Sequence, residues 1–261
     1  MSDTPLDAPT LDIGAIRAVA FDAYGTLFRF SDHEHRLAAA GTLAEQGLQA
    51  DLDAFAESLK KSFQHVSPWG DHKDENGKLD REHMLAGPVP DWISTWEIWR
   101  RQFAHTFEEY ELAGDAIAAA NQLRGVLAES NAYPDAHDTI EVIAGRGLIV
   151  GLLSNADEDF LQSAISRARL RFSVIESSES LRAYKPNRAV FQALCDRLHL
   201  APAEVLYVGD SPQADVHGAQ HAGLRTAWVR RSESMEYPED VPRADLEVTS
   251  LLEVAAALGL A

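Results

Sequence analysis

Residues 18–28 read Ala-Val-Ala-Phe-Asp-Ala-Tyr-Gly-Thr-Leu-Phe, and this stretch decides the fold. An apolar run that ends in a carboxylate, with a glycine soon after, predicts a buried strand that carries Asp22 at its carboxyl end and turns at Gly25. Open α/β sheets bind their ligands at this edge. The alternative is an ordinary strand end whose aspartate caps the next turn. Segments later in the chain decide between the two.

Two later segments carry polar groups in similar positions. The apolar run 148–153 leads directly into Ser154 and Asn155, which predicts another strand end with polar side chains. Further along, Lys185 comes directly before Pro186, and proline suits the first turn of a helix. We therefore expect a hydroxyl and an amide at one strand end, and a lysine just ahead of a helix.

A third segment repeats the carboxylate. The apolar run 205–208 leads into Gly-Asp-Ser at 209–211, and Asp215 follows Asp210 after five positions. Because ligands of such sheets gather at the carboxyl ends of the strands, these two carboxylates and Asp22 are expected to cluster there.

Taken in order, the four segments resemble the haloacid dehalogenase superfamily of hydrolases. They match its nucleophile motif at Asp22, its Ser/Thr motif at Ser154, its Lys-Pro motif at Lys185 and its Gly-Asp-Ser-x-x-x-Asp motif at 209–215. Each motif is short, and the specificity lies in the ordered set. The resemblance implies an α/β fold, a doubly wound parallel-sheet (Rossmann-like) core with an inserted helical cap domain.

The pattern along the chain agrees with that organisation. Short apolar runs alternate with helical patterns near the start of the chain and again after residue 134, as in parallel βαβ units. The interval 31–132 has no convincing strand and is expected to be the cap, with residues 1–30 and 133–261 forming the core. The expected strands are 18–21, 148–153, 174–175, 205–208, 226–229 and 246–248.

Three features of the expected cap are specific enough to check. Ser31 and Glu34 fit a capping box at the start of its first helix. The composition of residues 66–91 predicts a long exposed loop or a poorly ordered excursion of the cap. A set of aromatic residues recurs at helical spacing and indicates either a packing seam or an aromatic substrate pocket. Its members are Trp92, Trp96, Trp99, Phe103, Phe107 and Tyr110.

Composition limits the partners. The 261 residues carry 23 Lys and Arg against 41 Asp and Glu, a formal net charge of −18, so we expect neither nucleic acid nor membrane as a partner. Residues 1–10 are polar and acidic, and no apolar stretch is long enough to cross a bilayer, which favours a cytoplasmic location. The expected partner is a small anionic substrate, and the exposed aromatics of a cap helix offer a seam for a homodimer.

The resemblance implies phosphoryl transfer in two steps. Asp22 would attack phosphorus to form an aspartyl-phosphate, which water then hydrolyses. Mg²⁺ would be held by Asp22, the backbone carbonyl of Tyr24, Asp210 and Asp215, because it prefers oxygen ligands.

Other motif residues are assigned to the substrate. Lys185 and the Ser154 hydroxyl would hold phosphoryl oxygens, and Thr26 and Asn155 are the further substrate-binding candidates. Lys185 would also act in catalysis, since its positive charge offsets the three carboxylates.

Position 24 departs from the phosphatase pattern. Phosphatases of the superfamily usually have a second aspartate there, as general acid and base, whereas tyrosine is a poor base at neutral pH. Asp-x-Tyr-Gly-Thr resembles instead the L-2-haloacid dehalogenases, which form an aspartyl ester and need no metal. Against that, Asp210 stands where dehalogenases have small neutral polar residues, and Phe191 replaces their aromatic hydroxyl.

Three alternatives to the phosphohydrolase therefore stay open. One is an L-2-haloacid dehalogenase, and another is a catalytically weak protein that binds phosphate or a partner. The third is a phosphonate hydrolase, which needs a Schiff-base lysine from the cap. The cap lysines available for that role are Lys60, Lys61, Lys73 and Lys78.

Overall fold

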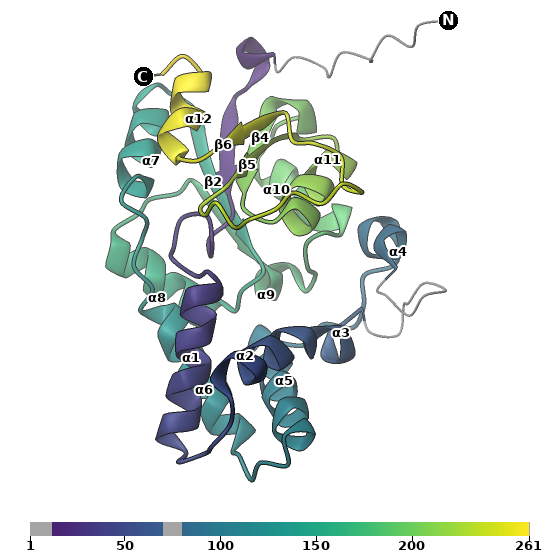
Figure 1. Cartoon of the computed structure of the whole chain (residues 1–261). Coiled ribbons are helices and arrows are strands. Elements are labelled where there is room, and N and C mark those ends of the chain that lie inside the picture. Colours follow the sequence, from purple (N-terminus) through teal and green to yellow (C-terminus); the bar gives the residue numbers. More distant parts are fainter. Residues whose placement is uncertain (1–11, 70–79, 261) are drawn as a thin grey trace, which may run out of the picture.

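A computed structural model describes residues 12–69 and 80–260 of the chain (Figure 1). Six parallel strands form one sheet in the order β3-β2-β1-β4-β5-β6, which confirms the predicted α/β fold class. The strands are β1 Ala18–Phe21, β2 Ile149–Ser154, β3 Val174–Ser177, β4 Val205–Gly209, β5 Arg225–Val229 and β6 Leu246–Val248.

The strand order creates a crevice beside β1. The chain runs outward from β1 through β2 to β3, then crosses to β4 on the other side of β1. Ala18 pairs with Ile149 of β2 and with Val205 of β4, so the three strands end close to one level. Ligands of doubly wound sheets bind at such a switch point, and Asp22 directly follows β1 there.

Helices cover both faces of the sheet because side chains along a strand alternate between its faces. Val19 and Phe21 are buried on the face covered by α7, α8 and α12, whereas Ala18 and Ala20 are buried on the face covered by α10 and α11 (Figure 1). The helices of this part are α7 Ala136–Gly145, α8 Glu158–Ala168, α9 Ser178–Leu181, α10 Arg188–Leu198, α11 Gly218–His221 and α12 Leu251–Ala257. Three short turns are η1 Ile13–Ala15, η2 Pro202–Glu204 and the π-helical η3 Pro212–His217.

Between β1 and α7 the chain is helical and lies beyond the carboxyl ends of the strands (Figure 1). We call α1 to α6 the insertion. Its helices are α1 Asp32–Glu45, α2 Leu52–Lys61, α3 Phe63–Val66, α4 Arg81–Ala86, α5 Thr95–Glu109 and α6 Ala116–Ala128.

The two connections between the insertion and the sheet run side by side. The backbone amide of Arg29 donates to the carbonyl of Asn131, and the amide of Tyr133 donates to the carbonyl of Leu27. The predicted capping box is confirmed at the start of α1, where the Ser31 hydroxyl accepts a backbone hydrogen bond and the N3 residue Glu34 accepts from the backbone amide of Ser31. Among the described helices, none combines the length and apolar character needed to cross a membrane.

Two sequence expectations were wrong in detail. Residues 66–91 are not simply an exposed loop, because they include α4, and the Trp69 side chain is only 2% exposed; residues 70–79 lie outside the described chain. Pro186 does not begin a helix. Asn187 caps α10 instead, since its side chain accepts a hydrogen bond from the amide of Ala189.

Candidate active site

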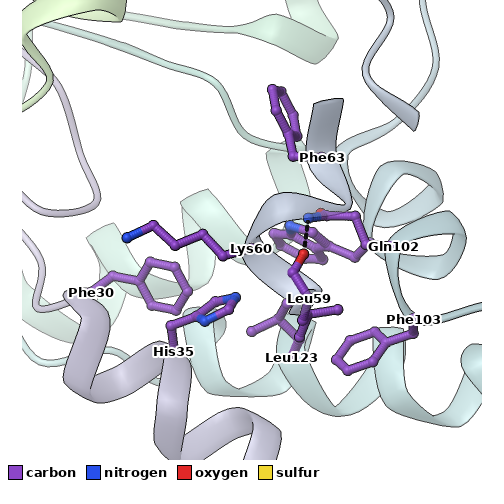
Figure 2. Close-up of a pocket in the computed structure, with 9 residues that line it drawn as sticks. Phe30, His35, Leu59, Lys60, Phe63, Gln102, Phe103 and Leu123 are labelled. Carbon is purple, nitrogen blue, oxygen red and sulfur yellow. Dashed lines mark hydrogen bonds between the residues drawn. The ribbon is translucent and has the colours of Figure 1, made fainter. Parts of the chain in front are cut away.

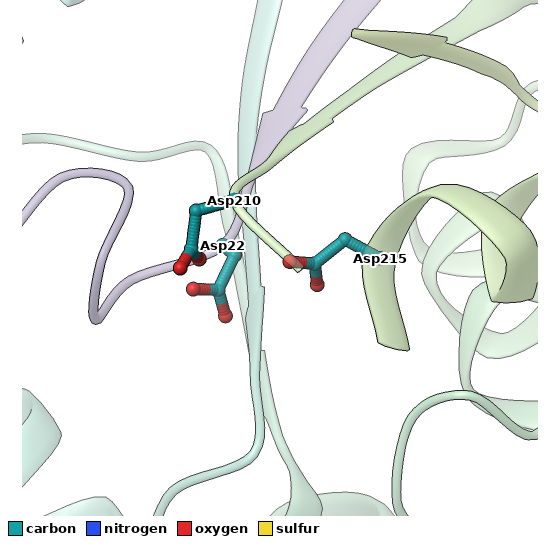
Figure 3. Close-up of side chains that lie close together, drawn as sticks. All are labelled: Asp22, Asp210 and Asp215. Atoms are coloured by element: carbon teal, nitrogen blue, oxygen red, sulfur yellow. The ribbon is translucent and has the colours of Figure 1, made fainter. Parts of the chain in front are cut away.

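Three carboxylates meet in the crevice beside β1 (Figure 3). Asp22 follows β1, Asp210 follows β4 and Asp215 lies in η3, and one oxygen from each lies within 4.8 Å of the others. Asp22 and Asp215 are buried. Carboxylates held this close repel one another, so the cluster can stay ionised only with a cation among or beside them.

Lys185 supplies one such cation. Its Nζ lies 2.5 Å from Oδ1 of Asp22 and 2.6 Å from Oδ1 of Asp215, and the lysine side chain is buried. Burial alone would lower the pKa of Lys185, but the two carboxylates outweigh it and raise that pKa well above its usual value. The lysine therefore stays charged. It also donates to the hydroxyl of Tyr207 at 3.1 Å, which in turn donates to the carbonyl of Leu153 at 2.7 Å.

One lysine does not balance three carboxylates. Burial, opposed by Lys185 and reinforced by Asp215, raises the pKa of Asp22 to about 6. Burial and the charges of Asp215 and Asp22 also raise the pKa of Asp210 well above its usual value. Both pKa values are raised because a further negative charge in this buried cluster is energetically unfavourable. A divalent cation with oxygen ligands would relieve that cost, so the residues present fit Mg²⁺.

Ser154 contacts Asp22, the ion-pair partner of Lys185, and Asn155 contacts the backbone of Lys185 itself. The Ser154 hydroxyl donates to Oδ1 of Asp22 at 3.1 Å, the same oxygen that accepts from Lys185. The Asn155 amide is occupied in both directions by the Lys185 backbone: its Nδ2 donates to the carbonyl at 3.1 Å, and its Oδ1 accepts from the amide at 2.8 Å. Asn155 therefore joins the loop after β2 to the loop that carries the lysine.

The turn after Asp22 is fitted against Asp210. The hydroxyl of Thr26 donates to Oδ1 of Asp210 at 3.2 Å. Gly25 has φ = +91°, which favours glycine, and a Cβ at this position would collide with the Asp210 carboxylate. Only glycine allows the turn to approach Asp210 this closely.

The hydroxyl of Tyr24 does not point to the carboxylates. It donates to the backbone carbonyl of Leu127 in α6 at 3.2 Å and to that of Phe160 in α8 at 3.3 Å. Its ring packs against Phe28 and Phe160. Burial and the charge of Asp22 raise the pKa of Tyr24, so its proton stays in place. Tyr24 therefore connects the nucleophile loop to both the insertion and α8.

Sequence reasoning missed Arg231, which lies just after β5. Its guanidinium donates to the carbonyl of Thr26 at 2.6 Å and to Asp135 at 2.8 Å, and it stacks 3.9 Å from the ring centre of Tyr133. Arg231 thus holds the nucleophile loop to one of the two connections of the insertion. No sequence motif indicates this role of Arg231, because an arginine two residues after a strand is common.

Asp157 was also missed. Its carboxylate accepts hydrogen bonds from the backbone amides of Thr95 at 2.8 Å and Trp96 at 2.9 Å, at the start of α5. Because Asp157 follows shortly after Ser154, it ties the insertion to the loop after β2. The N-terminus of a helix favours a carboxylate in this position. Nothing in the sequence indicates the contact, because Asp157 is one of many acidic residues in the chain.

Two neighbouring cavities lie near the site, one that reaches it and one within the insertion. The larger, about 640 Å³, has Gly25, Asp210, Arg29 and Arg231 in its wall. The smaller, about 280 Å³, is lined by two members of the aromatic set, Trp99 and Phe103. The aromatic set therefore has members in both kinds of environment. Trp99 and Phe103 line a cavity, whereas Phe107 packs in the core and the indole of Trp96 donates to Asn121. Of the four lysines, Lys60 pairs with Asp32, Lys61 pairs with Glu57, and Lys73 and Lys78 lie outside the described residues.

Comparison with known proteins agrees with this geometry. The family model of haloacid dehalogenase-like hydrolases matches residues 16–223. The chain is 28% identical over 245 residues to (S)-2-haloacid dehalogenase 4A of Burkholderia cepacia, covering 93% of this chain and 94% of that one. It is 35% identical over 223 residues to phosphoserine phosphatase of Thermus thermophilus, covering 82% and 87% of the two chains. A crystal structure of a dehalogenase in an intermediate complex superposes with a TM-score of 0.69 at 26% identity, covering 93% of this chain and 96% of that one.

Proposed function

Because the chain belongs to the haloacid dehalogenase-like hydrolases, we propose that it is a Mg²⁺-dependent phosphohydrolase acting on a small phosphorylated metabolite. The observation that supports this choice is Asp210. Its carboxylate completes a cluster with Asp22 and Asp215 within 4.8 Å, a donor set suited to a hard cation. The insertion would serve as the cap over this site.

In the proposed reaction the residues of the cluster have separate roles. Oδ1 of Asp22 accepts from both Lys185 and Ser154, so we assign the attack to Oδ2. Oδ2 forms a bond to phosphorus as the bond from phosphorus to the leaving oxygen breaks, and the leaving oxygen takes a proton from solvent water. Water then attacks the phosphorus of the aspartyl-phosphate, which releases phosphate and restores Asp22.

A bound Mg²⁺ would neutralise developing charge on the phosphoryl oxygens, held by Asp22, Asp210, Asp215 and the backbone carbonyl of Tyr24. Lys185 would add its own charge on the opposite side of the cluster. Because the Lys185 ammonium is already bonded to two carboxylates, it cannot alone balance an incoming phosphate.

The second candidate is an L-2-haloacid dehalogenase. The observation in its favour is Tyr24, which stands where phosphatases have the acid, together with the 28% identity to (S)-2-haloacid dehalogenase 4A. In that reaction Asp22 would attack carbon, halide would leave, and water would hydrolyse the ester. Asp210 has no role in it as a metal ligand.

One paired assay separates the two. Phosphate release from a panel of phosphate monoesters is measured with Mg²⁺ and with EDTA, beside chloride release from 2-chloropropionate. We expect Mg²⁺-dependent phosphate release, abolished in the Asp22→Asn variant. Chloride release together with no phosphate release from any ester would refute the phosphohydrolase in favour of the dehalogenase.

A further inference from the structure

The lining of the smaller cavity is mostly apolar (Figure 2). It lies between α1, α2, α5 and α6 of the insertion, and three of its walls are the buried side chains of Leu59, Phe103 and Leu123. A cavity of about 150 Å³ lined by apolar side chains suffices to bind benzene. At about 280 Å³, this one has room for a six-carbon chain or a substituted ring. Its lining is completed by Phe30, His35, Lys60, Phe63, Trp99 and Gln102.

The smaller cavity adjoins the larger one that reaches the site. Phe30, His35 and Lys60 line both cavities, whereas Asp210 and Gly25 line only the larger. A molecule with its reacting group beside Asp210 and a carbon chain directed past Phe30 would extend toward the smaller cavity. Because the two cavities share these three lining residues, we take the occupant to be part of the substrate and not a separate ligand.

Two polar side chains of the smaller cavity, Lys60 and Gln102, already have partners. Lys60 Nζ bonds to Asp32 at 2.7 Å, and Gln102 donates to the backbone carbonyl of Leu59 at 2.9 Å (Figure 2). Burial and the charge of Lys60 lower the pKa of His35, which keeps its ring neutral near pH 7. The cavity thus offers no free charge to an anion.

Apart from Lys60, which lines both cavities, the charged side chains line only the larger cavity. Arg29 and Arg231 line the larger cavity together with Asp210, and neither lines the smaller one. The two cavities therefore divide a bound molecule into a charged end near the carboxylates and an uncharged end near Phe103.

We propose that the smaller cavity binds the carbon part of the leaving alcohol, so that the preferred substrates are phosphate monoesters of apolar alcohols of about six carbons rather than of sugars or other polyols. This inference deepens the proposed phosphohydrolase and rests on it for the reacting group. The cavity itself depends only on the insertion and its contact with the larger cavity.

The test uses a series of n-alkyl phosphates from ethyl to octyl, whose leaving alcohols have similar acidity. Each added methylene buried in the cavity contributes about 0.8 kcal/mol, or roughly a fourfold rise in kcat/KM, until the cavity is full. We expect that rise to continue to about hexyl and then to level off. Glycerol phosphate should react more slowly than butyl phosphate, because its hydroxyls lose water without gaining partners.

A pair of variants locates the effect. Phe63 lines the cavity and is 41% exposed, so Phe63→Ala should leave the fold intact, and Ile117→Ala is the matched control because Ile117 is 54% exposed and lines neither cavity. We expect Phe63→Ala to lower kcat/KM for hexyl phosphate about threefold to tenfold and to leave that for ethyl phosphate within twofold. The control should change neither.

Inert alkylphosphonates give a readout that needs no turnover. Hexylphosphonate should bind at least tenfold more tightly than methylphosphonate by titration calorimetry, and Phe63→Ala should reduce the difference. Hydrolysis of the n-alkyl phosphates without any dependence on chain length would overturn the cavity proposal and leave the phosphohydrolase standing. Tight hexylphosphonate binding with no hydrolysis of any ester would support the cavity and refute the phosphohydrolase instead.

Discussion

The variant Tyr24→Phe tests which of two roles Tyr24 has. The residue either replaces the general acid that phosphatases carry at this position or anchors the cap. The hydroxyl donates to the carbonyls of Leu127 and Phe160, so its proton is directed toward the backbone of two helices. We expect Tyr24→Phe to behave as a loss of anchoring. Catalysis should survive in the folded fraction.

The size of the effect follows from those two contacts. Leaving a partly buried acceptor without its donor costs about 1–3 kcal/mol, and the phenylalanine ring keeps the packing against Phe28 and Phe160. At roughly 2–4 °C per kcal/mol for a large domain, Tm should fall by several degrees. The activity toward both alkyl and p-nitrophenyl phosphate should change by less than about tenfold.

A general acid gives the opposite result. Its loss costs about 10² to 10⁴ in rate and matters most when the leaving oxygen is strongly basic. The assay is therefore the ratio of kcat/KM for hexyl phosphate to that for p-nitrophenyl phosphate, beside urea denaturation of both proteins. A ratio that drops a hundredfold with unchanged stability would refute the anchoring role of Tyr24.

The companion variant Tyr24→Asp adds a carboxylate where phosphatases of the family have one. It should raise the same ratio while it loses more stability than Tyr24→Phe, because the ring packing against Phe28 and Phe160 is lost as well. No change in the ratio in a folded protein would mean that another group already supplies the proton.

Three further predictions concern the cluster and its support. Asp22→Asn should abolish turnover at an unchanged fold, because an amide is nearly isosteric but a poor nucleophile, and full activity free of wild-type contamination would contradict the covalent mechanism. Mg²⁺ at a hundredfold excess over its Kd should stabilise the protein by about 2.7 kcal/mol, and Asp210→Ala should remove that response in a thermal melt. Arg231→Gln should lower kcat/KM about tenfold, because a charged donor to the Thr26 carbonyl is lost, whereas an unchanged rate would show that Asp135 and the backbone hold the loop without it.

The positions of the motif residues were predictable because topology fixes them. Strand ends in a parallel sheet share one edge, so a carboxylate after β1, a hydroxyl at the end of β2 and a carboxylate after β4 must meet when those strands are neighbours. The contacts of Lys185 with Asp22 and Asp215 fit that expectation.

The site residues that the sequence analysis missed lie in segments that carry no recognisable motif. Tyr207 reads as an ordinary core strand residue, and its contact with Lys185 depends on which face of β4 it occupies. Arg231 and Asp157 work through backbone groups of distant segments, which one sequence does not pair. The direction of the Tyr24 hydroxyl likewise depends on how α6 and α8 are placed.

The protonation of Asp210 links the two candidate reactions. Burial and the neighbouring carboxylates raise its pKa, so without a divalent cation the protonated form is favoured as pH falls through that raised pKa. A neutral Asp210 resembles the small polar residue that dehalogenases carry, whereas bound Mg²⁺ requires the ionised form. Chloride release from 2-chloropropionate also needs ionised Asp22, with a pKa of about 6, so it should fall below pH 6 and again where Asp210 ionises.

The variant Asp210→Asn fixes the neutral state at every pH. It should lose Mg²⁺-dependent phosphate release, and its chloride release in EDTA should lack the fall at high pH that the wild type shows, because the upper limb of the pH profile disappears. Mg²⁺ should slow chloride release in the wild type and leave the variant unaffected. If Asp210→Asn keeps its Mg²⁺-dependent phosphate release, the metal is held by other residues, and the charge of Asp210 does not decide between attack at phosphorus and attack at carbon.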